Sequence, residues 1–140
     1  MQDFRQLKVW QKAHGLNLKV YAATAAFPKS EMFGLTSQIR RAGVSITANL
    51  AEGCGRGTDA DFARFTFMAM GSACELESHL ELAKDLQFLS SADYRATLDN
   101  LIEVKRMLSA LISKLAPHRR PAAGPSPSAD GGRLIADSFL

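Results

Sequence analysis

Apolar residues recur every three or four positions along most of the chain, which is the spacing of one face of an α-helix. The first such stretch runs from about Phe4 to Ala26, and Pro28 ends it because proline cannot continue a helix. Ser30 is the expected N-cap of the second stretch, which closes at the glycines of residues 53–57. The first half of the chain therefore predicts two long helices.

A third and a fourth periodic stretch complete the pattern. Thr58 and Asp61 resemble a capping box at the start of the third, and the turn around Ser90 and Asp93 precedes the fourth, which ends before Pro117. Four helices joined by short connections predict an all-α fold, an antiparallel up-down-up-down four-helix bundle over residues 1–116. In that topology the first and third helices lie diagonally opposite each other.

Residues 117–140 differ in composition from the rest of the chain. Pro, Gly and Ser dominate 117–132, and such a segment buries too little apolar surface to fold, so we predict a flexible tail over 117–140. The last eight residues, RLIADSFL, regain apolar side chains. A frayed end is one interpretation of them, and docking on a groove of this or another subunit is the other.

One face of the second helix carries polar side chains beside its apolar stripe. At about 100° per residue, the polar stripe consists of Gln38, Arg41, Ser45, Asn49 and Glu52. Such side chains hydrogen-bond to one another or to facing helices when they are buried, which offsets their desolvation. We interpret them, together with Glu75 of the third helix, as a structural polar network that fixes helix register or a subunit contact. A solvated face without a role is the alternative.

Charge is distributed unevenly around a formal net charge of +3. Residues 1–57 contain eight Lys or Arg and three acids, whereas residues 58–116 contain six Lys or Arg and nine acids. On the third helix Glu77, Glu81 and Asp85 form an acidic ladder at spacings of four. On the first helix, a basic stripe is formed by Arg5, Lys8, Lys12 and Lys19. Because the two helices are diagonal, an outward ladder cannot reach this stripe in the same subunit. Pairing between subunits would give a head-to-tail contact that can close into a ring.

The first helix supports assembly independently. Leu7, Trp10, Leu18 and Tyr21 form a second apolar sector beside the face that points to the core. The simplest explanation of two apolar faces is that one packs in the core and the other contacts a neighbouring subunit. We therefore predict a cyclic homo-oligomer that assembles through the first helix and its flanks.

Patterns that would indicate catalysis or metal binding are incomplete. Glu75 and His79 are four residues apart rather than three, and no second such pair exists for a di-iron site. Cys54 and Cys74 have no CxxC spacing, so two buried free thiols in a reducing cytoplasm are expected. The glycines of 53–57 lack the Lys-Ser/Thr of a phosphate loop. We predict no enzyme activity, no catalytic residue, no metal and no cofactor, and the charged N-terminal residues argue against a signal peptide.

Many positions between Phe4 and Leu115 resemble one family, the small four-helix-bundle proteins first noticed in intervening sequences of bacterial 23S rRNA genes. The matching positions are Phe4, Leu7, Val9, Trp10, Gln11 and Ala13; Phe27, Pro28, Glu31, Gly34 and Leu35; Gln38 to Ala42; Ser45, Ile46, Asn49, Ala51, Glu52 and Gly53; Arg64 and Phe65; and Gly71, Ser72, Glu75 and Leu76. The resemblance implies an antiparallel bundle that forms a ring of five subunits. One branch of the family serves diversity-generating retroelements, in which the basic surface is thought to engage nucleic acid and a partner reverse transcriptase.

Two function classes follow from these observations. The first is an oligomeric module that binds RNA or DNA through backbone phosphates, which Lys and Arg contact without reading bases. The candidate residues are Arg5, Lys8, Lys12, Lys19, Arg40 and Arg56. The second is a scaffold whose ring binds proteins alone, or an accessory partner of a reverse transcriptase. The scaffold becomes the better interpretation if the basic stripe is used up by a neighbouring subunit.

Overall fold

The computed structural model of the protein describes residues 3–116, and the predicted tail over 117–140 lies outside the described residues. The elements are two short 3₁₀ helices, η1 (Phe4–Gln6) and η2 (Lys29–Glu31), and four α-helices, α1 (Lys8–Thr24), α2 (Leu35–Gly55), α3 (Asp59–Asp85) and α4 (Ser91–Leu115). In the described part of the chain, no helix is both long and apolar enough to span a membrane. The all-α prediction is confirmed.

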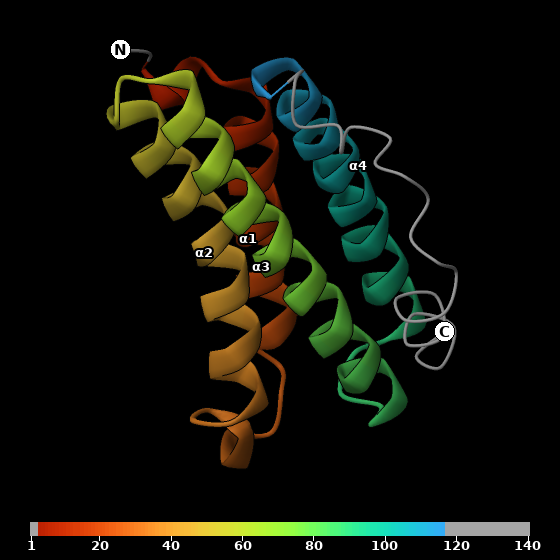
Figure 1. Cartoon of the computed structure of the whole chain (residues 1–140). Helices are drawn as coiled ribbons and strands as arrows, with labels where there is room; N and C mark the ends of the chain where they lie inside the picture. The colour runs from red at the N-terminus through yellow and green to blue at the C-terminus, as the bar shows by residue number, and fades with distance from the viewer. Residues whose placement is uncertain (1–2, 117–140) are drawn as a thin grey trace, which may run out of the picture.

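Successive helices run in opposite directions along one bundle axis (Figure 1). α2 packs against α1 and α3, and α4 packs against α3 and α1, whereas α1 and α3 do not contact each other. The predicted diagonal arrangement is therefore confirmed. One end of the bundle brings together the start of α1, the end of α2, the start of α3 and the end of α4. We call it the basic end, because several Lys and Arg side chains lie there, as described below.

The core consists of the apolar positions that the periodicity selects. The largest fully buried apolar side chains are Leu16, Val20, Ile39, Ile46, Leu50, Leu76, Leu101, Val104 and Leu108. All four α-helices contribute to this one cluster. Each helix buries one stripe and leaves the opposite stripe in solvent, so the bundle is held together mainly by removal of apolar surface from water.

The two later helix starts are confirmed by their caps. The Thr58 hydroxyl accepts a hydrogen bond from the Asp61 amide at 3.2 Å, and the Ser90 hydroxyl accepts one from the Asp93 amide at 3.1 Å. Gly57, between α2 and α3, has a φ of +86°, a backbone conformation that L side chains rarely adopt. The glycine-rich end of the second helix thus allows the sharp turn into α3.

The two earlier helix starts were predicted wrongly. The first helix is broken, because Asp3 caps η1 and Leu7 is extended before α1 begins at Lys8. Ser30 does not cap α2 but lies within η2. Instead, the Glu31 carboxylate accepts a hydrogen bond from the Leu35 amide at 3.0 Å, so α2 starts four residues later.

Small and polar side chains set the spacing between α2 and its two neighbours. Asn17 of α1 is buried and donates a hydrogen bond to the Thr47 hydroxyl of α2 at 3.2 Å. Ser45 of α2 and Ser72 of α3 share a hydrogen bond of 2.8 Å. A Cβ at Gly53 would lie 2.9 Å from the Cβ of Phe65, so α2 and α3 approach closely there. Gly71 of α3, by contrast, is exposed, and a Cβ added there would have nothing within 4 Å.

Candidate nucleic-acid interface and assembly face

Most of the predicted basic residues gather at the basic end. Arg5 lies in η1, Lys8 begins α1, and Lys12 follows one turn later. Arg56 caps the end of α2 at the same end of the bundle (Figure 1). Lys19 and Arg40 lie further along the axis, toward the opposite end. Four of the six candidates are thus brought together by the antiparallel topology.

The lysines of α1 lie along its border with α4. Lys8 lines a groove with Arg106 and Met107 of α4. The hydrogen bond from Arg106 lowers the pKa of Glu103, and the charge of Lys12 lowers it further, so Lys12 also lies near α4. In the described residues, no acid lies within ion-pair distance of Lys8, Lys12 or Lys19, and all three are exposed. These ammonium groups are therefore available to an external anion.

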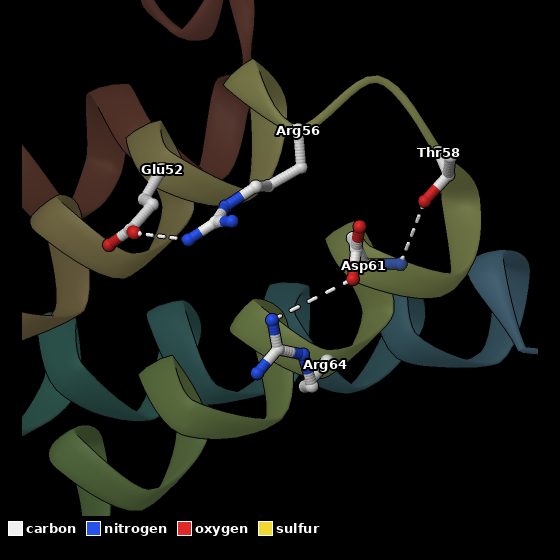
Figure 2. A network of polar contacts seen from close by, with 5 residues as sticks. All are labelled: Glu52, Arg56, Thr58, Asp61 and Arg64. Atoms are coloured by element: carbon white, nitrogen blue, oxygen red, sulfur yellow. Dashed lines mark hydrogen bonds and ion pairs between the residues drawn. The ribbon is translucent and has the colours of Figure 1, made fainter.

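Two arginines, Arg56 and Arg64, lie at the turn between α2 and α3, and each is paired with an acid (Figure 2). The guanidinium carbons of Arg56 and Arg64 lie 5.0 Å and 4.7 Å from the centre of the Phe65 ring. Arg56 donates to Glu52 at 2.8 Å, and Arg64 lies 3.7 Å from Asp61. Stacking and pairing hold both cations in place, yet exposed pairs of this kind are weak enough for phosphate to displace a carboxylate. Arg64 was not predicted as a site residue, although the adjacent Phe65 is a signal for cation stacking.

Arg40 has a different role from the other five candidates. Its side chain is half-buried, donates to the Thr24 hydroxyl at 2.9 Å, and stacks 4.5 Å above the centre of the Tyr21 ring. These contacts join α2 to α1. The main role of Arg40 is therefore to hold α2 against α1 within the subunit.

The predicted polar network is only partly formed. Asn49 donates to the Ser45 carbonyl at 2.8 Å, and Ser45 shares a hydrogen bond with Ser72 of α3, so this part joins α2 to α3. The remaining members are exposed, namely Gln38, Arg41, Glu52 and Glu75. Glu52 pairs with Arg56 on its own helix, and Glu75 lies 3.2 Å from His79. The Arg41 side chain is exposed to solvent, so of its two predicted roles the subunit contact stays a prediction.

The acidic ladder is also engaged within the subunit. Glu77 is half-buried and accepts a hydrogen bond from Lys105 of α4 at 2.8 Å. Glu81 accepts one from the Tyr94 hydroxyl of α4 and lies 3.2 Å from Lys84. The interpretation of this ladder as an unpaired outward stripe is therefore wrong, because its first two acids turn toward α4 rather than away from the bundle.

The hydrogen bond between Tyr94 and Glu81 predicts a pH-dependent stability. It lowers the pKa of Glu81 below its usual 4.5 and raises the pKa of Tyr94 above its usual 10.0. The stabilisation is present between these values, is lost as the pH falls through the pKa of Glu81 in the folded state, and is lost as it rises through that of Tyr94. We expect Tyr94→Phe to lower the free energy of unfolding at pH 7 and to have a smaller effect at pH 3, measured by urea unfolding. An equal loss at both values would attribute the effect to packing.

The outer side of α2 carries a groove whose lining is partly apolar and partly polar. The groove has a volume of about 990 Å³, and its lining includes the small residues Ser37 and Ala48. Phe33 is 94% exposed, Met32 56% and Val44 44%, and all three line this groove. We call Met32, Phe33, Ser37, Arg41, Val44 and Ala48 the α2 face. Clustered apolar exposure of this kind is typical of interaction surfaces.

The second apolar sector of the first helix divides between core and surface. Leu7 and Trp10 are half-buried and pack against the core cluster. Leu18 and Tyr21 are exposed, and Tyr21 borders the α2 groove. The apolar surface available to a neighbour thus lies at the border of α1 and α2 and on α2 itself, rather than along the whole of α1.

The two cysteines lie in different environments. Cys54 is buried, and desolvation, with a smaller contribution from Asp3, raises the pKa of its thiol, which disfavours the reactive thiolate. Cys74 is exposed on α3, so the expectation of two buried thiols is wrong for this residue. Within residues 3–116, no group of three or more His, Cys, Asp or Glu side chains is arranged to hold a metal ion.

Comparison with known proteins agrees with this fold. The model of the 23S rRNA-intervening sequence protein family matches residues 5–110. A solved structure described as a protein with unknown function from the S23 ribosomal protein family, from Bacteroides thetaiotaomicron VPI-5482, aligns with a TM-score of 0.67 and 25% sequence identity. The alignment covers 74% of this chain and 97% of that chain. No curated protein matches the sequence.

Proposed function

The chain belongs to the 23S rRNA-intervening sequence protein family, and from its geometry we propose a non-enzymatic, homo-oligomeric module of the cytoplasm that binds nucleic acid through a basic surface. The observation that carries this proposal is the gathering of Arg5, Lys8, Lys12 and Arg56 at one end of the bundle, with Arg64 beside them. Among the described residues, no acid lies within ion-pair distance of Lys8 or Lys12, and the arginines have exposed, displaceable partners. Such a surface binds phosphates without reading sequence.

The basic end is suited to a phosphate backbone for two reasons. The paired guanidinium groups above Phe65 present planar donor edges, which match phosphate oxygens. Lys8 and Lys12 extend the positive surface along α1 by one helical turn. Oligomerisation would multiply this charge, since five copies of a chain with net charge +3 would together carry about fifteen positive charges around one axis.

We propose that the α2 face forms the contact between subunits in a ring of five. It lies along the side of the bundle, whereas the basic residues lie at one end, so assembly leaves the basic end accessible. The face offers exposed apolar side chains, with small residues Ser37 and Ala48 that let a neighbouring helix approach. Arg41 within the face and Glu75 beside it offer polar contacts to the neighbouring subunit.

A protein-binding scaffold is the second candidate function. It is favoured by the same groove, because exposed Phe33 and Met32 suit an apolar protein surface better than they suit phosphates. In that case, the partner occupies the α2 face and the basic end serves solubility. A reverse transcriptase is one such partner.

Nucleic-acid binding across a salt series tests the first proposal. We expect the purified protein to bind a structured RNA and a duplex DNA, with affinity falling steeply between about 50 and 200 mM salt, because bound Lys and Arg release counterions. Lys8→Glu/Lys12→Glu should weaken binding at low salt by at least about tenfold and reduce the salt slope by about two. Fluorescence anisotropy measures both quantities.

The matched control reverses the same number of charges elsewhere. Lys29→Glu/Arg95→Glu changes η2 and the start of α4, at the opposite end of the bundle, and should bind almost as well as the parent protein. An equal loss of affinity in both variants would mean that binding depends on the net charge of the protein and not on the position of the basic residues. Absence of binding at low salt, or a Lys8→Glu/Lys12→Glu variant whose mass falls to that of a monomer, would contradict the basic end as a nucleic-acid surface and favour the scaffold.

A further inference from the structure

A second groove lies at the basic end, at the border between the first and last helices. It has a volume of about 360 Å³ and is lined by Leu7, just before α1, by Val9 of α1, and by Met107, Ala110 and Leu111 from the last turns of α4. Lys8 and Arg106 form its rim. Both walls are mainly apolar, yet Met107 and Leu111 are only half-buried.

We propose that residues 133–140 of the same chain occupy this groove. The segment has the sequence RLIADSFL, in which Leu134, Ile135 and Phe139 match an apolar groove. Ile135 and Phe139 are four residues apart, the spacing at which two side chains share one face of a helix. Asp137 lies between them in the sequence, and Lys8 or Arg106 at the rim supplies an opposite charge.

The chain path makes this occupant the nearest one available. Leu111 lines the groove, and the last described residue, Ala116, follows it by about 7 Å of helix. Sixteen residues, 117–132, connect it to the proposed segment. A linker of that length and composition spans about 22 Å on average, enough to return to the groove. Tethering also raises the effective concentration of the segment to about the millimolar range, so that even a weak contact is populated.

Methionine-methyl NMR on the full chain tests the proposal. The chain contains five methionines, and Met107 lies in the groove, whereas Met32 and Met68 are exposed, the first just before α2 and the second on α3. We expect Ile135→Ser/Phe139→Ser to shift the Met107 methyl signal, because the Phe139 ring leaves its surroundings, and to leave the signals of Met32 and Met68 in place. The linker control Ala122→Ser/Ala123→Ser should leave all of them unchanged.

Two further measurements decide the occupant. Adding a synthetic RLIADSFL peptide to the Ile135→Ser/Phe139→Ser variant should return the Met107 signal toward its position in the parent protein. Identical Met107 signals in parent and variant would overturn the proposal. A signal in the parent protein that moves on dilution would also overturn it, because the occupant would then be the segment of a second copy.

Discussion

Gly53→Leu is expected to destabilise the bundle by about 3 kcal/mol, because the new side chain has no room between α2 and α3. A Cβ at this position would lie 2.9 Å from the Cβ of Phe65 and 3.1 Å from a ring carbon of Phe62. Neither atom is at the free end of a flexible side chain, so the helices themselves must move apart. The movement would also displace Phe65 from beneath Arg56 and Arg64, which links the packing of the core to the basic end.

The same substitution at Gly71 provides the control. Gly71 lies in the middle of α3, is exposed, and has no atom within 4 Å of an added Cβ. Gly71→Leu should therefore stabilise the protein by about 0.5–1 kcal/mol, since glycine is a poor helix former. Thermal and urea unfolding of the two variants should give changes of opposite sign. If Gly53→Leu left the free energy of unfolding almost unchanged or increased it, the contact between α2 and α3 would tolerate separation of the two helices.

Helix positions were predictable wherever a signal is local. Thr58 caps α3 as predicted, and Ser90, predicted only as part of a turn, caps α4; both signals are local, because an N-cap and its partner amide lie within three residues of each other. The heptad spacing of leucines selected the buried stripes, since only the number of residues between them matters. Diagonal packing of α1 and α3 followed from the short connections alone.

The start of α2 was not predictable in the same way. Ser30 has the right residue type for a cap, yet Glu31 performs this function by reaching forward to the Leu35 amide. Gly34 permits that contact, because a Cβ there would lie 2.7 Å from the Glu31 carboxylate oxygen. Whether a serine or the next glutamate caps a helix depends on the path of the chain between them, which residue type does not specify.

In the candidate site, the partners that side chains find on other helices could not be predicted from the sequence. Helical periodicity places Glu77 and Glu81 on one stripe, but it does not say which neighbour the stripe faces, and α4 supplies Lys105 and Tyr94. Arg56 was identified from its charge, whereas Arg64 required knowledge that α2 and α3 bring both guanidinium groups to one ring. Contacts between helices therefore had to come from the structure.

The basic end and the α2 face lie in different places, so the two proposed functions, nucleic-acid binding and subunit assembly, use different surfaces. The sequence had predicted one helix for both. The first helix was expected to supply both the basic stripe and the subunit contact. In the structure, Lys8 and Lys12 border α4, while the exposed apolar residues Phe33 and Val44 lie just before α2 and on α2 itself. Charge and assembly can thus be altered independently, which makes each of the two proposals testable without disturbing the other.

Phe33→Asp should dissociate the proposed ring while leaving the subunit folded. Phe33 is 94% exposed in the subunit, so its replacement removes almost no packing within the bundle. At a subunit contact, an unpaired carboxylate would be buried, which costs about 3–5 kcal/mol and weakens association by at least about a hundredfold. Sedimentation at micromolar concentration should give an oligomer for the parent protein and a monomer for the variant, with unchanged helical circular dichroism.

Two further substitutions test whether the effect is specific to the α2 face: Val44→Asp lies on the face, and Ile102→Asp is the control outside it. Val44 lies on the α2 face, and Val44→Asp should also yield a monomer. Ile102 of α4 is 51% exposed and lies outside that face, so Ile102→Asp makes the same chemical change at a comparable exposure and should remain assembled. Loss of assembly in all three variants would indicate general destabilisation. A monomeric parent protein would exclude the ring, and the α2 face would then be the surface for a different protein.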